Sequence, residues 1–202
     1  SIAAVQPSRL PMLPANAAPA GGPASLRSKD AKGAGSKIDI YLGEFLISPV
    51  PLELSLNWCS HACPFCFANL NSPERKANAP AIMRQLAKVG TGRGLDTTLM
   101  RAGYPVLISN RVDPFANSNY KQAVPIMETM TAAGIQYTIQ TRGGRGIDDV
   151  LSFAPPSVWY VSICTLDDAL RKELEPGAPT TDSRFELIQQ LREAGHRVVL
   201  GL

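Results

Sequence analysis

Residues 49–68 read P-V-P-L-E-L-S-L-N-W-C-S-H-A-C-P-F-C-F-A, a strand-like run that leads directly into three cysteines. Apolar and polar residues alternate in its first half, which predicts a strand over 49–57 with its leucines on one face. Cys59, Cys63 and Cys66 follow in a C-x3-C-x2-C spacing, so one short loop can direct three thiolates to one point. A structural zinc normally takes four protein ligands, whereas three thiolates on a [4Fe–4S] cluster leave one iron open to a small molecule.

The bulk composition indicates a globular chain with one substantial domain. It has 202 residues, of which 45% are hydrophobic and 18% charged. The net charge of +3 permits a nucleic-acid partner without arguing for one. No apolar run reaches the length of a membrane span, and the N-terminus lacks the pattern of a secretory signal. Because the cysteine loop needs reduced thiols, we expect a cytoplasmic protein with no membrane partner.

The chain divides by composition near residue 37. Residues 1–36 are rich in Pro, Ala and Gly, which predicts a flexible leader. Over 37–202 strand-like runs alternate with helical ones, as in an α/β fold with a parallel sheet and crossover helices. The predicted strands are 49–57, 105–109, 136–141, 158–164 and 197–202, the predicted helices are 73–89, 119–133, 147–153 and 182–194, and 90–103 is a glycine-containing connection. Units of this kind ending on a strand predict a partial (β/α) barrel, either truncated after its fifth strand or unusually open.

The cysteine spacing resembles that of the radical S-adenosylmethionine (SAM) superfamily. Phe65 and Phe67 flank Cys66, and Ala68 follows them. This sequence around the cysteines resembles that of the branch that contains spore photoproduct lyase. Three further stretches resemble the same branch: D-P-F at 113–115, V-S-I-C-T-L-D-D at 161–168 and L-E-P-G-A-P at 174–179. The resemblance covers about residues 54–202.

That resemblance implies an enzyme with a particular cofactor chemistry. Cys59, Cys63 and Cys66 would hold a [4Fe–4S] cluster whose open iron binds SAM. An electron from the cluster would cleave SAM to a 5′-deoxyadenosyl radical, which abstracts hydrogen from an unknown substrate. It also implies an electron donor such as flavodoxin or ferredoxin, and a nucleic-acid substrate by family analogy alone. Because the strand predicted at 105–109 has no cysteine, lyase activity proper is not expected.

Polar residues at the carboxyl ends of the predicted strands are candidates for SAM binding, since active sites of parallel β/α barrels lie at that edge. The alternative is a sheet with one solvated face. Phe65 would stack on adenine, although a packing role is equally consistent. Arg142 would hold a carboxylate, with a solvated turn charge as its alternative. The candidate cofactor-binding residues are Asn57, Phe65, Ser109, Asn110, Arg142 and Ser162.

Other polar residues carry weaker signals. Cys164, at the end of the fourth predicted strand, is the candidate catalytic residue, as a hydrogen donor or substrate contact, with a small core hydrophobe as the alternative. Asp113 would bind substrate or ribose, or else begin the next helix. His61 is expected to pack beside the cluster and His196 to lie on the surface. Asp167 and Asp168 are expected to cap a turn, and Glu175 is expected to be structural.

Three hypotheses for function follow. The first is a radical SAM enzyme, and the second is a degenerate cluster-binding subunit with a structural or interaction role. The third is a zinc-binding module in which His61 is the fourth ligand.

Overall fold

A six-stranded sheet organises the part of the chain that the computed structural model describes, which is residues 41–42, 52–54, 56, 59–66, 79–108 and 112–201. The strands are β1 (Tyr41–Leu42), β2 (Leu52–Leu54), β3 (Val106–Ile108), β4 (Tyr137–Thr141), β5 (Val158–Ser162) and β6 (Arg197–Gly201). The helices are α1 (Ala79–Ala87), α2 (Leu95–Arg101), α3 (Tyr120–Ala132), α4 (Ile147–Phe153), α5 (Asp168–Leu174) and α6 (Thr181–Glu193). The predicted leader over 1–36 lies outside the described residues, so the boundary at 37 stays a prediction.

The strands follow one another across the sheet in chain order, from β1 to β6. Strands β2 to β6 are all parallel, and β1, which the sequence did not predict, pairs antiparallel with β2. Parallel neighbours need a crossover connection, and helices lie in the segments between successive parallel strands from β3 onward. The α/β class and the strand order of a partial β/α barrel are therefore as predicted.

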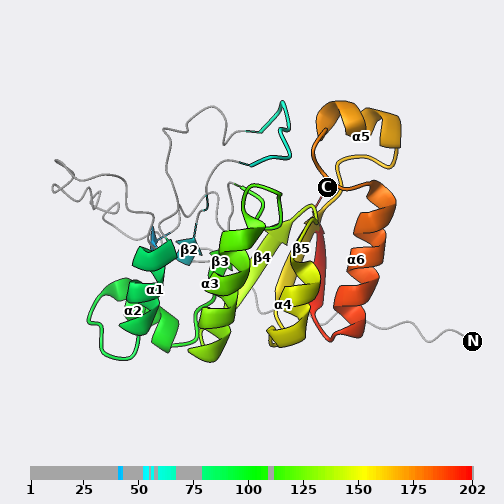
Figure 1. Ribbon diagram of the computed structural model, residues 1–202. Coiled ribbons are helices and arrows are strands. Elements are labelled where there is room, and N and C mark those ends of the chain that lie inside the picture. Colours follow the sequence, from blue (N-terminus) through cyan, green and yellow to red (C-terminus); the bar gives the residue numbers. More distant parts are fainter. Residues whose placement is uncertain are drawn as a thin grey trace, which may run out of the picture. The chain divides into compact units, whose positions relative to one another are not determined.

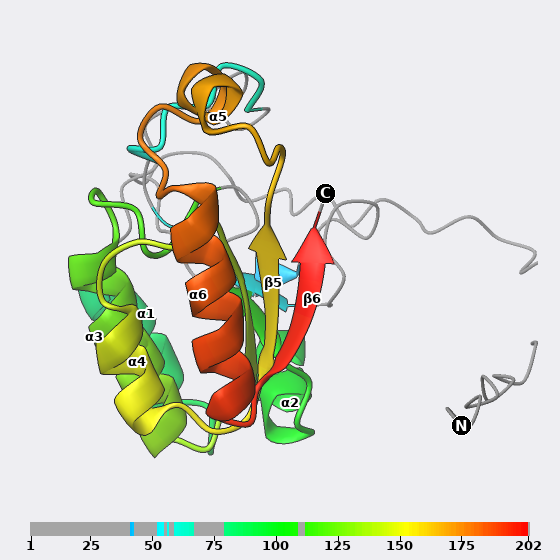
Figure 2. The ribbon, with the colours of Figure 1, turned by 90° about the vertical axis from the view of Figure 1, so that its right-hand side faces the viewer.

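The helices α3, α4 and α6 lie to one side of the strands, as Figures 1 and 2 show. The strand side chains on that side are almost fully buried, and they form one apolar core with the helices. Trp159 on β5 is completely buried and stacks on Phe115, with ring centroids 5.6 Å apart. Burial of such large apolar surfaces is the main stabilising term for this fold.

The opposite face of the sheet is more polar. Thr138 and Gln140 on β4 stand beside Val158 and Tyr160 on β5, and Ser162 stands beside Gly201 on β6. Side chains of a strand alternate between faces, so Gln140, Tyr160 and Ser162 point away from the helices that cover the core. This arrangement supports the prediction of a polar inward face.

The segment predicted as a plain connection over 90–103 contains helix α2. Its four glycines favour a loop, but Thr97 and Met100 are buried and anchor a helical turn against the core. Asp96 in its first turn also accepts a 2.9 Å hydrogen bond from Gln85 of α1. Tertiary contacts therefore override the local signal from glycine.

Helix α5 is another element that the sequence did not predict. Asp167, expected to cap a turn, is its N-cap and accepts hydrogen bonds from the backbone of Ala169 and Leu170. Arg171, only 4% exposed, donates to the carbonyls of Glu175 and Ala178 and so ties the helix end to the residues that follow.

The prediction that His196 lies on the surface was wrong. Its ring is 6% exposed and packs against Trp159, and Nδ1 accepts a 3.1 Å hydrogen bond from the backbone N–H of Ser157. Burial lowers the pKa of His196. The residue closes the amino edge of the sheet, where β5 and β6 begin, and is remote from the cysteines in the chain.

Candidate cofactor site

The three cysteines lie in a loop, residues 59–66, that follows β2 and that we call the cysteine loop. Cys63 is 5% exposed, Cys59 and Cys66 are half-buried, and all three are free thiols. Burial raises the pKa of Cys59, and it raises that of Cys63 to about 11 even though Arg142 acts in the opposite direction. An isolated thiolate is therefore costly here, whereas coordination to a metal deprotonates a thiol outright.

The three thiols of the cysteine loop lie near one another in the described structure. Negative charge on Cys59 and Cys66 would raise the pKa of Cys63, so the three sulfurs lie within electrostatic reach of one another. Within the described ranges, however, no three His, Cys, Asp or Glu side chains converge as the ligands of one metal ion. Three cysteine thiols on one loop are the donor set of a [4Fe–4S] cluster with one open iron, so the residues present fit such a cluster.

His61 is held by two protein groups, one on each ring nitrogen. Its Nε2 lies 3.1 Å from Asp113 Oδ2, and its Nδ1 lies 3.0 Å from the carbonyl oxygen of Gly177. Burial opposes the charged ring, but the Asp113 carboxylate outweighs it, and the net effect raises the pKa of His61. A ring whose nitrogens both face acceptors is poorly placed to be the fourth ligand of a zinc site, which disfavours the zinc hypothesis.

Asp113, in the loop after β3, is a junction between separate elements. Its Oδ1 accepts from Phe115 N at 2.9 Å and from Thr141 Oγ1 at 2.8 Å. Its Oδ2 accepts from Arg142 N at 2.5 Å and faces His61. Both carboxylate oxygens are thus occupied within the protein, which disfavours the predicted role in binding substrate or ribose.

Two further contacts fix the cysteine loop from outside. Ser60 and Ser118 exchange hydrogen bonds, each backbone N–H donating to the other's hydroxyl at 3.1 and 3.2 Å. On the other side, Gly177 N donates to the carbonyl of His61 at 2.9 Å. A Cβ at Gly177 would stand only 2.2 Å from the Ser60 carbonyl oxygen, so the two backbones approach as closely as glycine permits.

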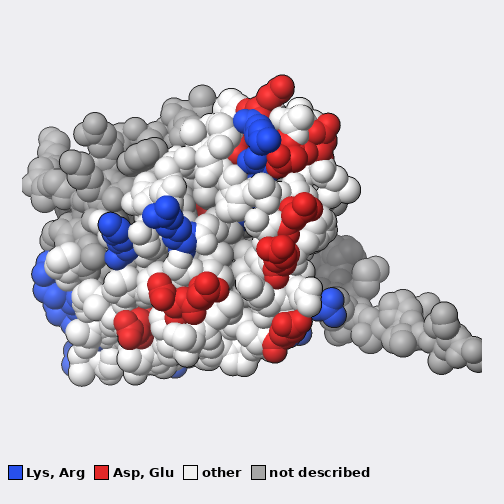
Figure 3. Space-filling model, turned by 45° about the vertical axis from the view of Figure 1, so that its right-hand side comes forward, with Lys and Arg blue, Asp and Glu red and all other residues white. Residues whose placement is uncertain are grey.

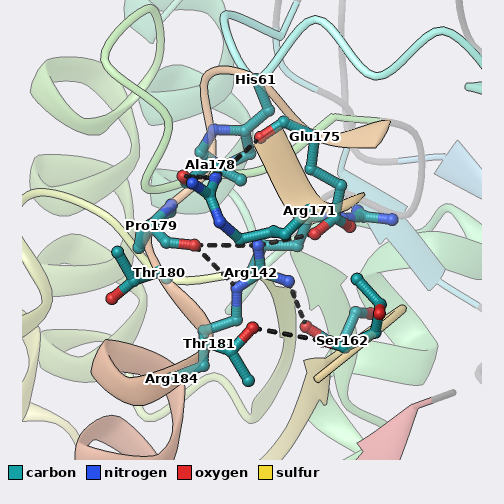
Figure 4. A network of polar contacts seen from close by, with 12 residues as sticks. His61, Arg142, Ser162, Arg171, Glu175, Ala178, Pro179, Thr180, Thr181 and Arg184 are labelled. Carbon is teal, nitrogen blue, oxygen red and sulfur yellow. Dashed lines mark hydrogen bonds and ion pairs between the residues drawn. The ribbon is translucent and has the colours of Figure 1, made fainter. Parts of the chain in front are cut away.

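A buried carboxylate, Glu175, organises the neighbouring charges, as Figure 4 shows. It is fully buried and pairs with Arg142 through Nε and with Arg184 through Nη2, the latter at 2.6 Å. Burial opposes ionisation, but the hydrogen bonds from the two guanidinium groups outweigh it and lower the pKa of Glu175. The guanidinium carbon of Arg142 lies 5.8 Å from the ring centroid of Phe65 in the cysteine loop. Arg142 is thus a paired residue facing the cysteine loop, and the alternative of a solvated turn charge is wrong.

The structure brings part of the predicted site together. Arg142, Phe65 and Cys63 lie close to one another, and Ser162 lies at the carboxyl end of β5, where its carbonyl accepts from Arg184 Nη1 at 2.9 Å. Phe65 is 52% exposed, so a purely internal packing role does not describe it. The predicted Asn57, Ser109 and Asn110 lie outside the described residues.

Cys164 does not lie in a strand, because β5 ends at Ser162. The thiol is exposed, so the alternative of a small core hydrophobe is wrong. Burial and a hydrogen bond to the buried Glu175 raise the pKa of Cys164. Its place at the carboxyl edge, beside the charged network, is consistent with contact to a bound molecule.

Asp113 and Glu175 are the two buried carboxylates around which this site is built, a role that the sequence did not predict for either. Both stand in segments that carried the family resemblance, D-P-F at 113–115 and L-E-P-G-A-P at 174–179. Both segments contact His61 of the cysteine loop. The sequence signal that could have identified them is that each acidic residue stands directly before a proline.

Comparisons with known proteins agree with this geometry. A family model described as the radical SAM superfamily matches residues 54–202, so the chain belongs to that superfamily. Among curated proteins, it is 27% identical over 165 residues to the uncharacterized protein ORF301 of Acidianus two-tailed virus, covering 72% of this chain and 55% of that protein. It is 29% identical over 150 residues to the uncharacterized protein Rv2578c of Mycobacterium tuberculosis, covering 68% of this chain and 44% of that protein.

Solved structures of SuiB from Streptococcus suis share the fold. The structure of SuiB bound to S-adenosylmethionine superimposes with a TM-score of 0.51 at 18% identity, covering 82% of this chain and 32% of SuiB. The structure of SuiB bound to precursor peptide SuiA gives a TM-score of 0.53 at 19% identity, covering 82% and 33%. The predicted α/β fold of the radical SAM type is thereby confirmed. The chain spans about half the length of these curated relatives and about a third of SuiB.

Proposed function

We propose that this chain is the catalytic core of a radical SAM enzyme, with a [4Fe–4S] cluster held by Cys59, Cys63 and Cys66. The observation that carries the proposal is a loop with three free thiols, fixed at the carboxyl edge of a parallel sheet by buried charged groups. Because His61 is committed to Asp113 and Gly177, the three thiolates would leave one iron open. When bound, such a cluster supplies one electron that cleaves SAM and yields a 5′-deoxyadenosyl radical.

The chain's own residues would orient the cofactors. Arg142 uses Nε for Glu175, and the described residues offer its Nη groups no hydrogen-bond partner, so these can hold the SAM carboxylate. The exposed ring of Phe65 is available to stack on adenine. Ser162 and the polar face with Gln140 and Tyr160 would hydrogen-bond the remainder of SAM or the substrate. Asn57, Ser109 and Asn110 remain candidates from the sequence alone.

The finer assignment is to the spore photoproduct lyase-like branch, without the lyase activity itself. Support comes from the D-P-F and E-P-G-A-P segments, which both contact His61 of the cysteine loop. Val106–Ile108 of β3 contains no cysteine that could return a hydrogen atom, whereas Cys164 is exposed at the same edge of the sheet. Cys164 is therefore the candidate hydrogen donor or substrate contact.

The partners of the protein and its cellular location are also proposals. An electron donor such as flavodoxin or ferredoxin would reduce the cluster, and a nucleic-acid substrate has the support of family analogy alone. On the face shown in Figure 3, acidic and basic side chains are interspersed. None of the described helices combines the length and apolarity that a bilayer crossing needs. A cytoplasmic location stays an expectation from the reduced thiols.

Metal analysis after anaerobic reconstitution tests the proposal directly. We expect about four irons and four sulfides per chain and a brown protein, and with dithionite and SAM we expect 5′-deoxyadenosine. Cys63→Ala should abolish the cluster and SAM cleavage, whereas Cys164→Ala, a matched change at an exposed thiol, should keep the cluster. One zinc and no colour would instead select the zinc module. A cluster without SAM cleavage would select the degenerate subunit.

A further inference from the structure

The cysteine loop consists of turns and irregular backbone and contains no helix or strand. Its internal backbone bonds are Ala62 N to the Cys59 carbonyl at 3.4 Å and Cys66 N to the Cys63 carbonyl at 3.1 Å. Ala62 adopts a φ of 54°, a left-handed conformation that disfavours a residue with a Cβ. Such a conformation persists only where surrounding contacts impose it, so the position of the thiols depends on groups outside the loop.

His61 is the side chain that connects the loop to two other elements at once. Its Nε2 reaches Asp113 after β3, and its Nδ1 reaches the Gly177 carbonyl after α5, both on a ring that is 3% exposed. The two nitrogens lie on opposite sides of a rigid ring, so a single buried group spans the space between the two segments. Water competes poorly for these contacts because the ring is buried.

The partner of His61 is itself rigidly held. Asp113 accepts from Phe115 N and Thr141 Oγ1 through the other carboxylate oxygen. The oxygen that faces His61, Oδ2, also accepts from the backbone N–H of Arg142 at 2.5 Å. One atom therefore joins the cysteine loop to the end of β4, from which the Arg142 side chain reaches toward Phe65.

We propose that His61 and Asp113 are positioning residues that hold the three thiols in register with Arg142 at the carboxyl edge of the sheet. The role would be exerted through the loop, with no contact between either side chain and substrate. Its catalytic meaning rests on the proposed function, because Arg142 and the cluster would both contact the methionine end of the same SAM molecule. Whether His61 and Asp113 hold the cysteine loop in position can be tested without any cofactor.

The first experiment measures how fast each thiol of the cofactor-free full chain reacts with iodoacetamide, by mass spectrometry of peptides. Cys63 is buried and should react slowly, and the exposed Cys164 provides an internal control. His61→Asn keeps an amide that can reach Gly177 but loses Asp113, and His61→Gln does the reverse. We expect Cys63 to react about ten- to hundredfold faster in His61→Asn and Asp113→Asn, and less than tenfold faster in His61→Gln.

A double-mutant cycle identifies the shared contact. If His61 acts through Asp113, the double variant His61→Asn with Asp113→Asn should react no more than about threefold faster than Asp113→Asn alone. Asp148→Asn, the same chemical change at an exposed aspartate of α4, should leave Cys63 unchanged. An unchanged Cys63 rate in His61→Asn, or effects that multiply in the double variant, would overturn the proposal. If Cys164 also reacted faster in these variants, the cause would be general unfolding, which would contradict a local role of His61 in holding the cysteine loop.

The second experiment uses the reconstituted protein and reads SAM affinity from the spectroscopic change that SAM causes at the reduced cluster. His61→Asn should retain iron and sulfide, because no ligand is removed, but should bind SAM about tenfold more weakly or worse. Normal affinity with a normal cluster spectrum would refute the positioning role. If the wild-type chain takes up no iron and sulfide, the proposed function fails. The alkylation experiment still decides whether His61 holds the cysteine loop in position.

Discussion

Replacing Gly177 with alanine should displace the cysteine loop. The added Cβ would stand 2.2 Å from the Ser60 carbonyl oxygen and 2.9 Å from the His61 Cα. Both are backbone atoms, so they cannot rotate away as the end of a flexible side chain could. Either the cysteine loop or the residues around Gly177 must move, and the 2.9 Å hydrogen bond from Gly177 N to the His61 carbonyl lies in the same contact.

The expected cost follows from overpacking. Forcing an extra carbon into a close-packed contact typically costs about 1–3 kcal/mol. For a chain of this size each kcal/mol lowers the melting temperature by about 2–4 °C, which predicts a fall of about 2–12 °C. A contact between backbone atoms places the expected value in the upper half of that range.

Thermal unfolding followed by circular dichroism measures this cost, and reactivity of Cys63 reports the displacement. Gly90→Ala is the matched control, because no atom lies within 4 Å of a Cβ there. That variant should melt at or slightly above the wild-type temperature, as glycine-to-alanine changes do at compatible sites. If Gly177→Ala melted like Gly90→Ala and Cys63 stayed protected, the inferred packing of the cysteine loop would be refuted.

Three other variants test separate parts of the structure. Glu175→Gln leaves two guanidinium groups facing a neutral amide in a buried site and should lower the free energy of unfolding by about 3–5 kcal/mol in urea titrations, whereas Glu186→Gln at an exposed position should change it little. Burial lowers the pKa of His196, so the unfolded chain binds the proton more readily, and the free energy of unfolding should fall as pH drops below about 6.5. In His196→Asn the free energy of unfolding should lose this part of its dependence on pH. An unchanged pH dependence would contradict the assignment. Cys164→Ser should retain iron, sulfide and SAM cleavage but lose turnover once a substrate is found, and unimpaired turnover would exclude a role as hydrogen donor.

The sequence by itself determined the family and the order of the elements. A three-cysteine spacing after a strand is specific because few structures need three thiolates and an open position, and the matching family model covers the same stretch of chain. Alternation and helical periodicity located β3 to β6 and α3, α4 and α6 within a few residues, since these elements bury a regular face. Short elements such as α2 and α5 escaped prediction because their local signals are weak.

Only the tertiary structure shows which charged residues contact one another. Asp113 lies 52 positions from His61 along the chain and Glu175 lies 33 positions from Arg142, yet each pair is in contact. Periodicity cannot reveal such pairs, because it describes which face a residue occupies and not what another loop brings to that face. Burial then gives these contacts their strength, since a charge removed from water must find its partner within the fold.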